Sequence, residues 1–208
     1  LVTGVQTCAL PIYLSKPGHD WGSAFTPLMT YNGSTYFVFP GKQNVSGNIP
    51  MMICKNTDCK HPLITDLEVS MHDDPTHNGA SLGIDKFGFI HVVGNARRPN
   101  GPSEENERWQ YWVSNNPEDI SSFTKIPLSI PASAPADPRM IPGHKFNYPF
   151  FFKEPGDQGE LYVVFRDQGQ ANNLEVRTGN IARYNASLNV TQGTWTELGG
   201  PPKSNIAG

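Results

Sequence analysis

Five side chains that could take part in acid–base chemistry or hydrogen bonding fall within seven positions, just before a short hairpin. They are His72, Asp73, Asp74, His77 and Asn78. A histidine, with a reference pKa near ~6.5, can accept a proton near neutral pH. Polar groups packed this densely at the entry to a strand are costly unless they are exposed or hydrogen-bonded. We therefore expect the rest of the chain to present this turn.

The same turn allows two other interpretations. His77 could cap the turn by hydrogen-bonding Asp73 or Asp74, and the residues alone favour that structural role. Asp73 and Asp74 could also be the paired acids of a glycoside hydrolase. Adjacent residues of an extended chain point in opposite directions, however, so one shared site is disfavoured. The better role for the two carboxylates is to satisfy N–H groups of the turn.

The elements that must position this turn are short strands. After it, the apolar segments 81–84 and 89–93 form a hairpin through the turn Asp85–Gly88. The chain has 20 Gly and 19 Pro among 208 residues, above ordinary usage and spread between apolar runs, which is typical of many strands joined by turns. The best helical segment, 117–123, is one turn at most. The fold class is all-β, with expected strands at 28–31, 35–39, 50–54, 63–69, 81–84, 89–93, 108–114, 124–128, 146–153, 161–166, 175–185 and 194–198.

A pattern of apolar strand, glycine-containing turn and apolar returning strand occurs three times. It reads LMTYNGSTYFVF, then SLGIDKFGFIHVV, then YPFFFKEPGDQGELYVVF. Repeated units of about four strands are the sequence signature of a β-propeller, because a single such sheet cannot bury both of its faces alone. A two-sheet sandwich is the alternative. Propellers usually have ~4–8 blades, so three visible repeats predict a β-propeller fragment of about three to four blades.

Charge and hydropathy exclude two classes of partner. The net charge of −3 lacks the basic clustering of a nucleic-acid binder. No apolar run approaches the ~20 residues of a membrane span. We expect no cofactor, no nucleic-acid partner and no membrane partner, and the oligomeric state stays open.

Cys54 and Cys59 flank a short turn, and three interpretations remain open for them. They could close a disulfide across a hairpin, they could stay unpaired thiols, or, least favoured, they could bind a metal together with His61. Four N-x-S/T triplets, at Asn32, Asn44, Asn185 and Asn189, would suit a secreted protein. The sequence therefore favours an extracellular location.

The first residues of the chain are expected not to be native. Residues 2–12, VTGVQTCALPI, resemble the in-frame translation of a DNA-sequencing adapter. A hydrophobic strand or the tail of a signal peptide would be the alternatives, but there is no basic segment or initiating methionine before them. The expected division is residues 1–12 as an artefact and residues 13–208 as a partial propeller domain.

Four stretches carry a resemblance to a known family: HDDPTHNGASLGIDKFGFIHVV, YWVSNNPEDISSF, FNYPFFF and GELYVVFRDQG. Together they resemble the BNR-repeat-containing propellers, and within these the propeller-type polysaccharide lyases that act on ulvan. The resemblance implies a seven-bladed propeller and cleavage by β-elimination next to a uronic acid. It implies that His77, Tyr148 and Arg166 are catalytic. Two extra residues, Pro75 and Thr76, stand inside the D-D-H-N turn, so His72 is an alternative to His77.

The residue types suit that reaction. β-Elimination removes a proton from the carbon beside a carboxylate and expels the 4-linked oxygen, so it needs a cation, a base and an acid. Arg166 can neutralise the carboxylate with a planar, permanently charged group. His77 can act as a base near neutral pH, and Tyr148 is a candidate proton donor. Which of the two is base and which is acid stays open.

Other residues complete the candidate site, each with a simpler alternative. Asn78, Arg97 and Asp167 are candidate substrate-binding residues for an anionic polysaccharide. Arg97 could equally lie in a solvated loop, and Arg166 and Asp167 could form a local ion pair of little energetic weight. Most of the alternating aromatics Trp109, Tyr111 and Trp112 are expected in the core, with His91 as a packed histidine. Besides a lyase, a sialidase-like glycoside hydrolase and a non-catalytic glycan-binding propeller remain alternatives.

Overall fold

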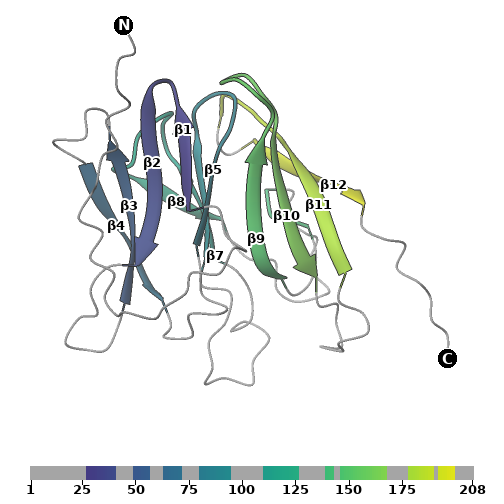
Figure 1. Ribbon diagram of the computed structural model, residues 1–208, viewed down its shortest axis with the longest axis horizontal. Helices are drawn as coiled ribbons and strands as arrows, with labels where there is room; N and C mark the ends of the chain where they lie inside the picture. Colours follow the sequence, from purple (N-terminus) through teal and green to yellow (C-terminus); the bar gives the residue numbers. More distant parts are fainter. Residues whose placement is uncertain are drawn as a thin grey trace, which may run out of the picture.

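Twelve β-strands form three four-stranded antiparallel sheets (Figure 1). The computed structural model describes residues 27–40, 49–56, 63–71, 80–94, 110–126, 139–142, 146–167, 178–189 and 192–199. The first sheet contains β1 (Leu28–Tyr31), β2 (Ser34–Pro40), β3 (Ile49–Asn56) and β4 (Leu63–Met71). The second contains β5 (Ala80–Ile84), β6 (Ile90–Gly94), β7 (Gln110–Ser114) and β8 (Phe123–Ile126). The third contains β9 (Phe146–Lys153), β10 (Leu161–Asp167), β11 (Thr178–Asn185) and β12 (Thr194–Gly199).

Each sheet is a meander in which every strand pairs with its neighbours in sequence. The sheets stack side by side, with β5 next to both β1 and β9, and the first hairpin of each sheet lies at the same end of the molecule (Figure 1). Meanders of four strands stacked in this way are the blades of a β-propeller. The all-β propeller prediction is therefore confirmed, with three blades in the described part of the chain, and the two-sheet sandwich was wrong.

Local sequence explains the turns. Asn32 and Gly33 both have positive φ, 44° and 75°, as a two-residue hairpin turn requires. In the turn between β5 and β6, the Asp85 carboxylate accepts hydrogen bonds from the backbone N–H groups of Phe87 and Phe89, at 2.9 and 3.0 Å. Gly88 completes that turn with a φ of 89°. At 117–118 the chain makes a turn, and residues 110–126 contain no helix.

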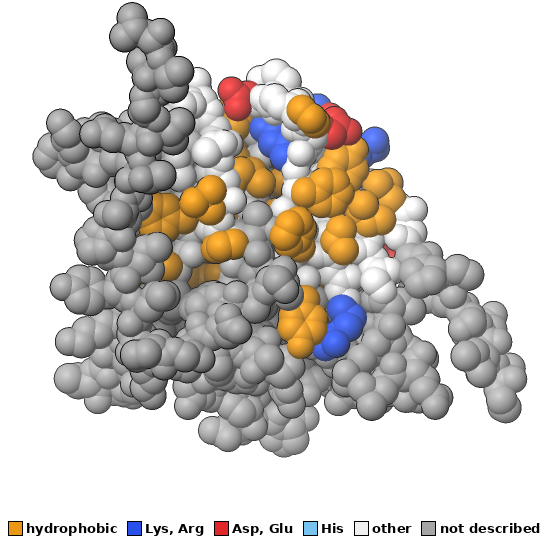
Figure 2. Space-filling view, viewed as in Figure 1, with side chains coloured by type: hydrophobic (Ala, Val, Ile, Leu, Met, Phe, Trp, Pro, Cys, Tyr) orange, Lys and Arg blue, Asp and Glu red, His pale blue; other side chains and the backbone are white. Residues whose placement is uncertain are grey.

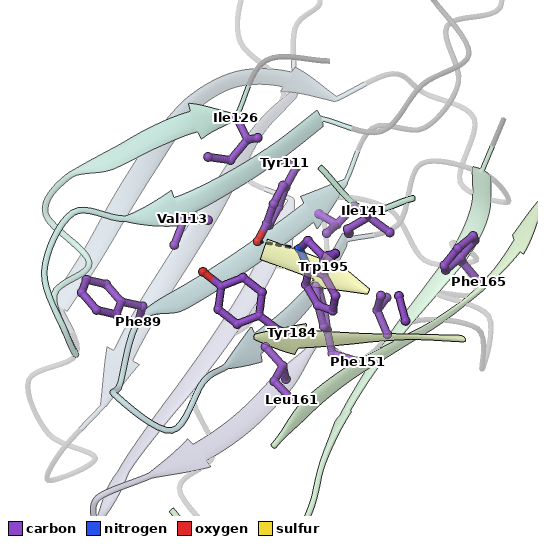
Figure 3. Close-up of a cluster of buried hydrophobic side chains, with 13 residues drawn as sticks. Phe89, Tyr111, Val113, Ile126, Ile141, Phe151, Leu161, Phe165, Tyr184 and Trp195 are labelled. Carbon is purple, nitrogen blue, oxygen red and sulfur yellow. Dashed lines mark hydrogen bonds between the residues drawn. The ribbon is translucent and has the colours of Figure 1, made fainter. Parts of the chain in front are cut away.

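Two apolar layers hold the three sheets together. β5 and β6 are buried along their whole length, because each face of the second sheet meets a neighbour. Leu82 and Ile84 on β5 belong to the layer shared with the first sheet. The other layer joins the second and third sheets, and Phe151, Leu161 and Trp195 lie within it (Figure 3).

The approach of β5 to β9 depends on a glycine. A Cβ placed on Gly83 would lie 2.8 Å from Cδ1 of Phe151 and 3.0 Å from Cδ1 of Leu161. The absence of a side chain at Gly83 therefore lets the Phe151 ring pack directly on β5. Real Cβ atoms do not approach that closely, so any other residue at this position would force the Phe151 ring to move.

The outer face of the third sheet is also apolar. Phe150 and Val164 form a cross-strand pair and are 41% and 39% exposed. Next to them, Phe152 and Tyr162 stack with ring centroids 4.9 Å apart. Figure 2 shows hydrophobic side chains gathered on this side of the molecule. Since Phe151 and Val163 fill the inner face, the third sheet carries apolar side chains on both faces, as a blade does.

A chain of polar groups crosses the layer between the second and third sheets. Trp195 Nε1–H donates to the Tyr111 hydroxyl at 3.2 Å, as the dashed line in Figure 3 marks. Burial raises the pKa of Tyr111 well above its ordinary value, so the hydroxyl keeps its proton and can donate it to His91 Nδ1 at 2.6 Å. On the other side of the ring, His91 Nε2 faces Asp85 Oδ2 at 3.6 Å. His91 is fully buried, which confirms the prediction of a packed histidine.

Cys54 is a buried free thiol, which favours the unpaired interpretation of this cysteine. Cys59 and His61 lie outside the described residues. Burial raises the pKa of Cys54 to about 11, so at pH 8 only about a thousandth of the thiol is ionised.

Among the described residues, no group of three or more His, Cys, Asp or Glu could hold a metal ion, and no helix is long and apolar enough to cross a bilayer.

The first prediction concerns the reactivity of Cys54. We expect it to resist an alkylating reagent at pH 8 in the folded protein and to react fully once the protein is unfolded in urea. The thiolate is the reactive form, and in the folded protein little of Cys54 is ionised and its side chain is buried. Peptide mass spectrometry would follow the modification, with Cys54→Ala to identify the peptide. Rapid labelling of the native protein would contradict the expectation.

Candidate functional site

Tyr148 lies in a β-bulge near the start of β9. Arg166 pairs with Asn147 and Val164 pairs with Phe150, so Tyr148 and Pro149 together stand opposite the single residue Phe165. A bulge of this kind leaves an extra residue unpaired and bends the strand. Pro149 suits the position because proline has no N–H to donate to the ladder. The bulge therefore takes Tyr148 out of regular strand geometry.

The backbone of Tyr148 is left-handed, with a φ of 57°. This conformation is unusual for a bulky aromatic residue and costs on the order of 1–3 kcal/mol. The other non-glycine residues with positive φ in the described part of the chain are Asn32, a residue type that tolerates it, and Glu118. Glu118 is held by hydrogen bonds from Asn32, Tyr36 and Lys55. Strained residues gather at functional sites, which makes Tyr148 a candidate on structural grounds.

Arg166 lies over the ring of Tyr148. Its Cζ atom is 4.5 Å from the centre of the ring, within the range of a cation–π interaction, and both side chains are partly exposed. The two residues come from different strands, and the bulge is what places the tyrosine against the cation. The structure thus brings together two of the three residues that the resemblance implied to be catalytic.

The bulge is tied to the neighbouring sheet. The Ser81 hydroxyl donates a hydrogen bond to the backbone carbonyl oxygen of Pro149. Ser81 is fully buried and is the second residue of β5. In sequence it follows His77 by four positions. Strand β5, which begins at Ala80, is therefore in contact with the residue that follows Tyr148.

The remaining candidates cannot be placed. His72, Asp73, Asp74, His77, Asn78 and Arg97 lie outside the described residues. Asp167 is the last residue of β10 and pairs with Phe146 and Thr178, but its side chain is not described. Of the alternating aromatics, Tyr111 and Trp112 are buried as predicted, and Trp109 is outside the described part of the chain.

Sequence reasoning did not find the bulge or Ser81. The signal for the bulge was present, because a proline in the middle of an apolar strand is confined to edges and bulges. Tyr148-Pro149 could have been interpreted in that way. Ser81 gave no comparable signal, since a serine at the start of a strand has no special meaning until its partner, 68 residues away, is known.

Comparison with solved structures shows the fold. "Crystal structure of polysaccharide lyase Uly1" matches with a TM-score of 0.59 at 14% identity, over 95% of this chain and 47% of that chain. The structure titled "Structure of a new family of Polysaccharide lyase PL25-Ulvanlyase bound to -[GlcA(1-4)Rha3S]-" matches with a TM-score of 0.48 at 13% identity, over 84% of this chain and 38% of that chain. This chain thus spans about half the length of the first of these proteins and less than half of the second.

A comparison with curated proteins gives no match. Comparison with protein families matches residues 51–204 to a family described as "BNR repeat-containing family member". The match covers the cysteine-bearing strand, the second and third blades and the Tyr148 bulge, which is well over half of the chain. The chain therefore belongs to the BNR-repeat-containing family.

Proposed function

We propose that this protein is a polysaccharide lyase that cleaves a uronic-acid-containing, ulvan-like glycan by β-elimination. The observation that carries the proposal is the left-handed Tyr148 held in its bulge against the guanidinium of Arg166. The class of reaction comes from the resemblance of the motifs around these residues. The likeness to a polysaccharide lyase structure supports the same propeller scaffold.

Each residue of the pair has a task in this reaction. The proton to be removed sits on the carbon beside the uronate carboxylate, and its loss builds negative charge that the carboxylate must share. A guanidinium that pairs with that carboxylate stabilises this charge in the transition state. The C–O bond to the 4-linked oxygen then breaks as a carbon–carbon double bond forms, and the leaving oxygen takes up a proton. Tyr148, a phenol beside the cation, is proposed for one of the two proton transfers.

His77 is proposed for the other proton transfer. It precedes Ser81 by four positions, and a chain of that length spans at most about 14 Å. Since Ser81 contacts Pro149, the covalent chain allows His77 to reach the substrate from the second blade while Tyr148 and Arg166 act from the third. Asn78, Arg97 and Asp167 are proposed to bind the anionic polysaccharide around this pair.

We also propose that the protein acts outside the cell, where such polysaccharides occur. Support comes from the N-x-S/T triplets. Asn32 and Asn185 are both in described residues, one in the exposed turn between β1 and β2 and the other at the end of β11.

The experiment is a cleavage assay on the purified, folded protein. We would incubate it with a panel of uronic-acid polysaccharides, ulvan included, and follow ultraviolet absorbance in the band of unsaturated uronates. A rise with at least one of these substrates is the expected result. Folded protein that gives no rise on the panel would overturn the proposal. Release of reducing ends without absorbance would then identify a glycoside hydrolase, and binding without cleavage would identify a glycan-binding propeller.

A further inference from the structure

The Tyr148 bulge lies where the ladder of the third sheet is irregular. The regular ladder between β9 and β10 is interrupted from Val164 to Arg166, and Pro149 has no N–H. Pro149 fixes its own φ through its ring. The carbonyl of Pro149, by contrast, is fixed by the Ser81 hydroxyl of the neighbouring sheet. This bond constrains the peptide between Pro149 and Phe150. Together with the fixed φ of Pro149, it limits the direction in which Tyr148 leaves the strand.

The packing around Ser81 makes this bond specific. Ser81 and Gly83 point to the third sheet, whereas Leu82 and Ile84 belong to the layer with the first sheet. Small residues on this face let β9 lie close to β5, since Gly83 already touches the Phe151 ring. A buried hydroxyl must find a partner, and in this position it reaches the Pro149 carbonyl.

We propose that Ser81 is a positioning residue for Tyr148: its hydrogen bond to the Pro149 carbonyl holds the bulge in the shape that places the tyrosine ring against Arg166. This inference rests on the proposed function for its effect on catalysis, but its effect on the tyrosine itself is independent of any activity. Ser81 acts through the backbone and touches no substrate. It also joins the strand that follows His77 to the strand that carries Tyr148.

The variants are Ser81→Ala, which removes the hydroxyl, and Ser81→Thr, which keeps it. Ser81→Cys replaces the hydroxyl with a thiol, which is a weak hydrogen-bond donor of similar size, and serves if the alanine variant does not fold. The control is Ser114→Ala. Ser114 is also fully buried in the second sheet, and its hydroxyl donates to the Asn116 carbonyl at 2.9 Å. None of the hydrogen bonds described for Ser114 reaches the Tyr148 bulge.

The first measurement is ¹⁹F NMR of protein labelled with 3-fluorotyrosine, with the Tyr148 signal assigned from Tyr148→Phe. In Ser81→Ala or Ser81→Cys we expect the Tyr148 resonance to shift or broaden. In Ser114→Ala it should stay in place, and Ser81→Thr, which keeps the donor but adds a buried methyl group, should shift it less than Ser81→Ala. An unmoved resonance in the folded alanine or cysteine variant would overturn the inference, whatever the cleavage assay shows.

The second measurement is steady-state cleavage. We expect kcat to fall about 10- to 100-fold in Ser81→Ala with KM nearly unchanged, because a small misplacement of a catalytic group has effects of that order. A moved resonance with unchanged kcat would overturn the catalytic part of the inference. A moved resonance in a protein that cleaves none of the substrates would keep the structural role of Ser81 and reject the proposed lyase function.

Discussion

Replacing Tyr148 with phenylalanine is expected to lower kcat for uronate glycan cleavage by about 10²- to 10⁴-fold, the usual contribution of a positioned acid or base. The substitution removes only the hydroxyl. The ring that lies 4.5 Å from Arg166 Cζ stays, so the bulge and the guanidinium should keep their places. We therefore expect KM to change little, because Arg166 can still pair with the substrate carboxylate. Initial rates from the absorbance assay over a range of glycan concentrations separate the two constants.

Tyr162→Phe is the matched control. It makes the same chemical change in the same sheet, at a phenol that donates to Glu154 Oε1 at 2.8 Å near the hairpin end of β10. Its kcat should stay close to that of the unsubstituted protein. If Tyr148→Phe retained full kcat, or if the two variants lost activity equally, Tyr148 would not take part in proton transfer.

The second large effect is expected on stability, from Phe151→Ala. Phe151 is 1% exposed and lies in the layer between the second and third sheets, next to Trp195 with ring centroids 6.1 Å apart (Figure 3). Removing a buried phenyl ring leaves a cavity and typically costs about 3–5 kcal/mol. Gly83, directly opposite, has no side chain to fill the space. Urea denaturation would measure the loss in the free energy of unfolding, with a fall in Tm of roughly 2–4 °C per kcal/mol for a chain of this size.

The neighbouring residue supplies the control for this experiment. Phe150 points to the opposite face of β9 and is 41% exposed, so Phe150→Ala removes the same ring from a position already in contact with water. Its cost should be well below that of Phe151→Ala. Equal losses from the two variants would show that the layer between the sheets does not decide stability, contrary to the packing described here.

The blades could be predicted from the sequence because their signals are local. Asn32-Gly33 and Asp85–Gly88 form turns through the preferences of two to four adjacent residues, and the structure has both. All twelve expected strands are present, and ends that lie within the described residues differ by at most two residues. The point at which a strand ends depends on the neighbouring strand, which the local pattern does not contain.

The site was predictable only in part. The pair Tyr148 and Arg166 came from a resemblance of motifs, and the structure places the two in contact. Pro149 within an apolar strand was a local signal for the bulge, but the hydrogen bond from Ser81 to Pro149 joins residues 68 positions apart, which no local pattern encodes. His77, Asn78 and Arg97 stay predictions, since they lie outside the described residues.

The order in which the chain opens follows from the burial of β5 and β6 on both faces. Every strand pairs with its neighbours in sequence, and the second sheet packs against both others. The free energy of unfolding of these three sheets is therefore close to a sum of one contribution from each blade and one from each of the two interfaces, as in repeat proteins. We expect the second sheet to open later than the first and third, because its opening breaks both of these interfaces. Backbone amides of β5 and β6 should therefore be the last to exchange with deuterated solvent, and Tyr148 in the third blade should sense local opening before the second blade does.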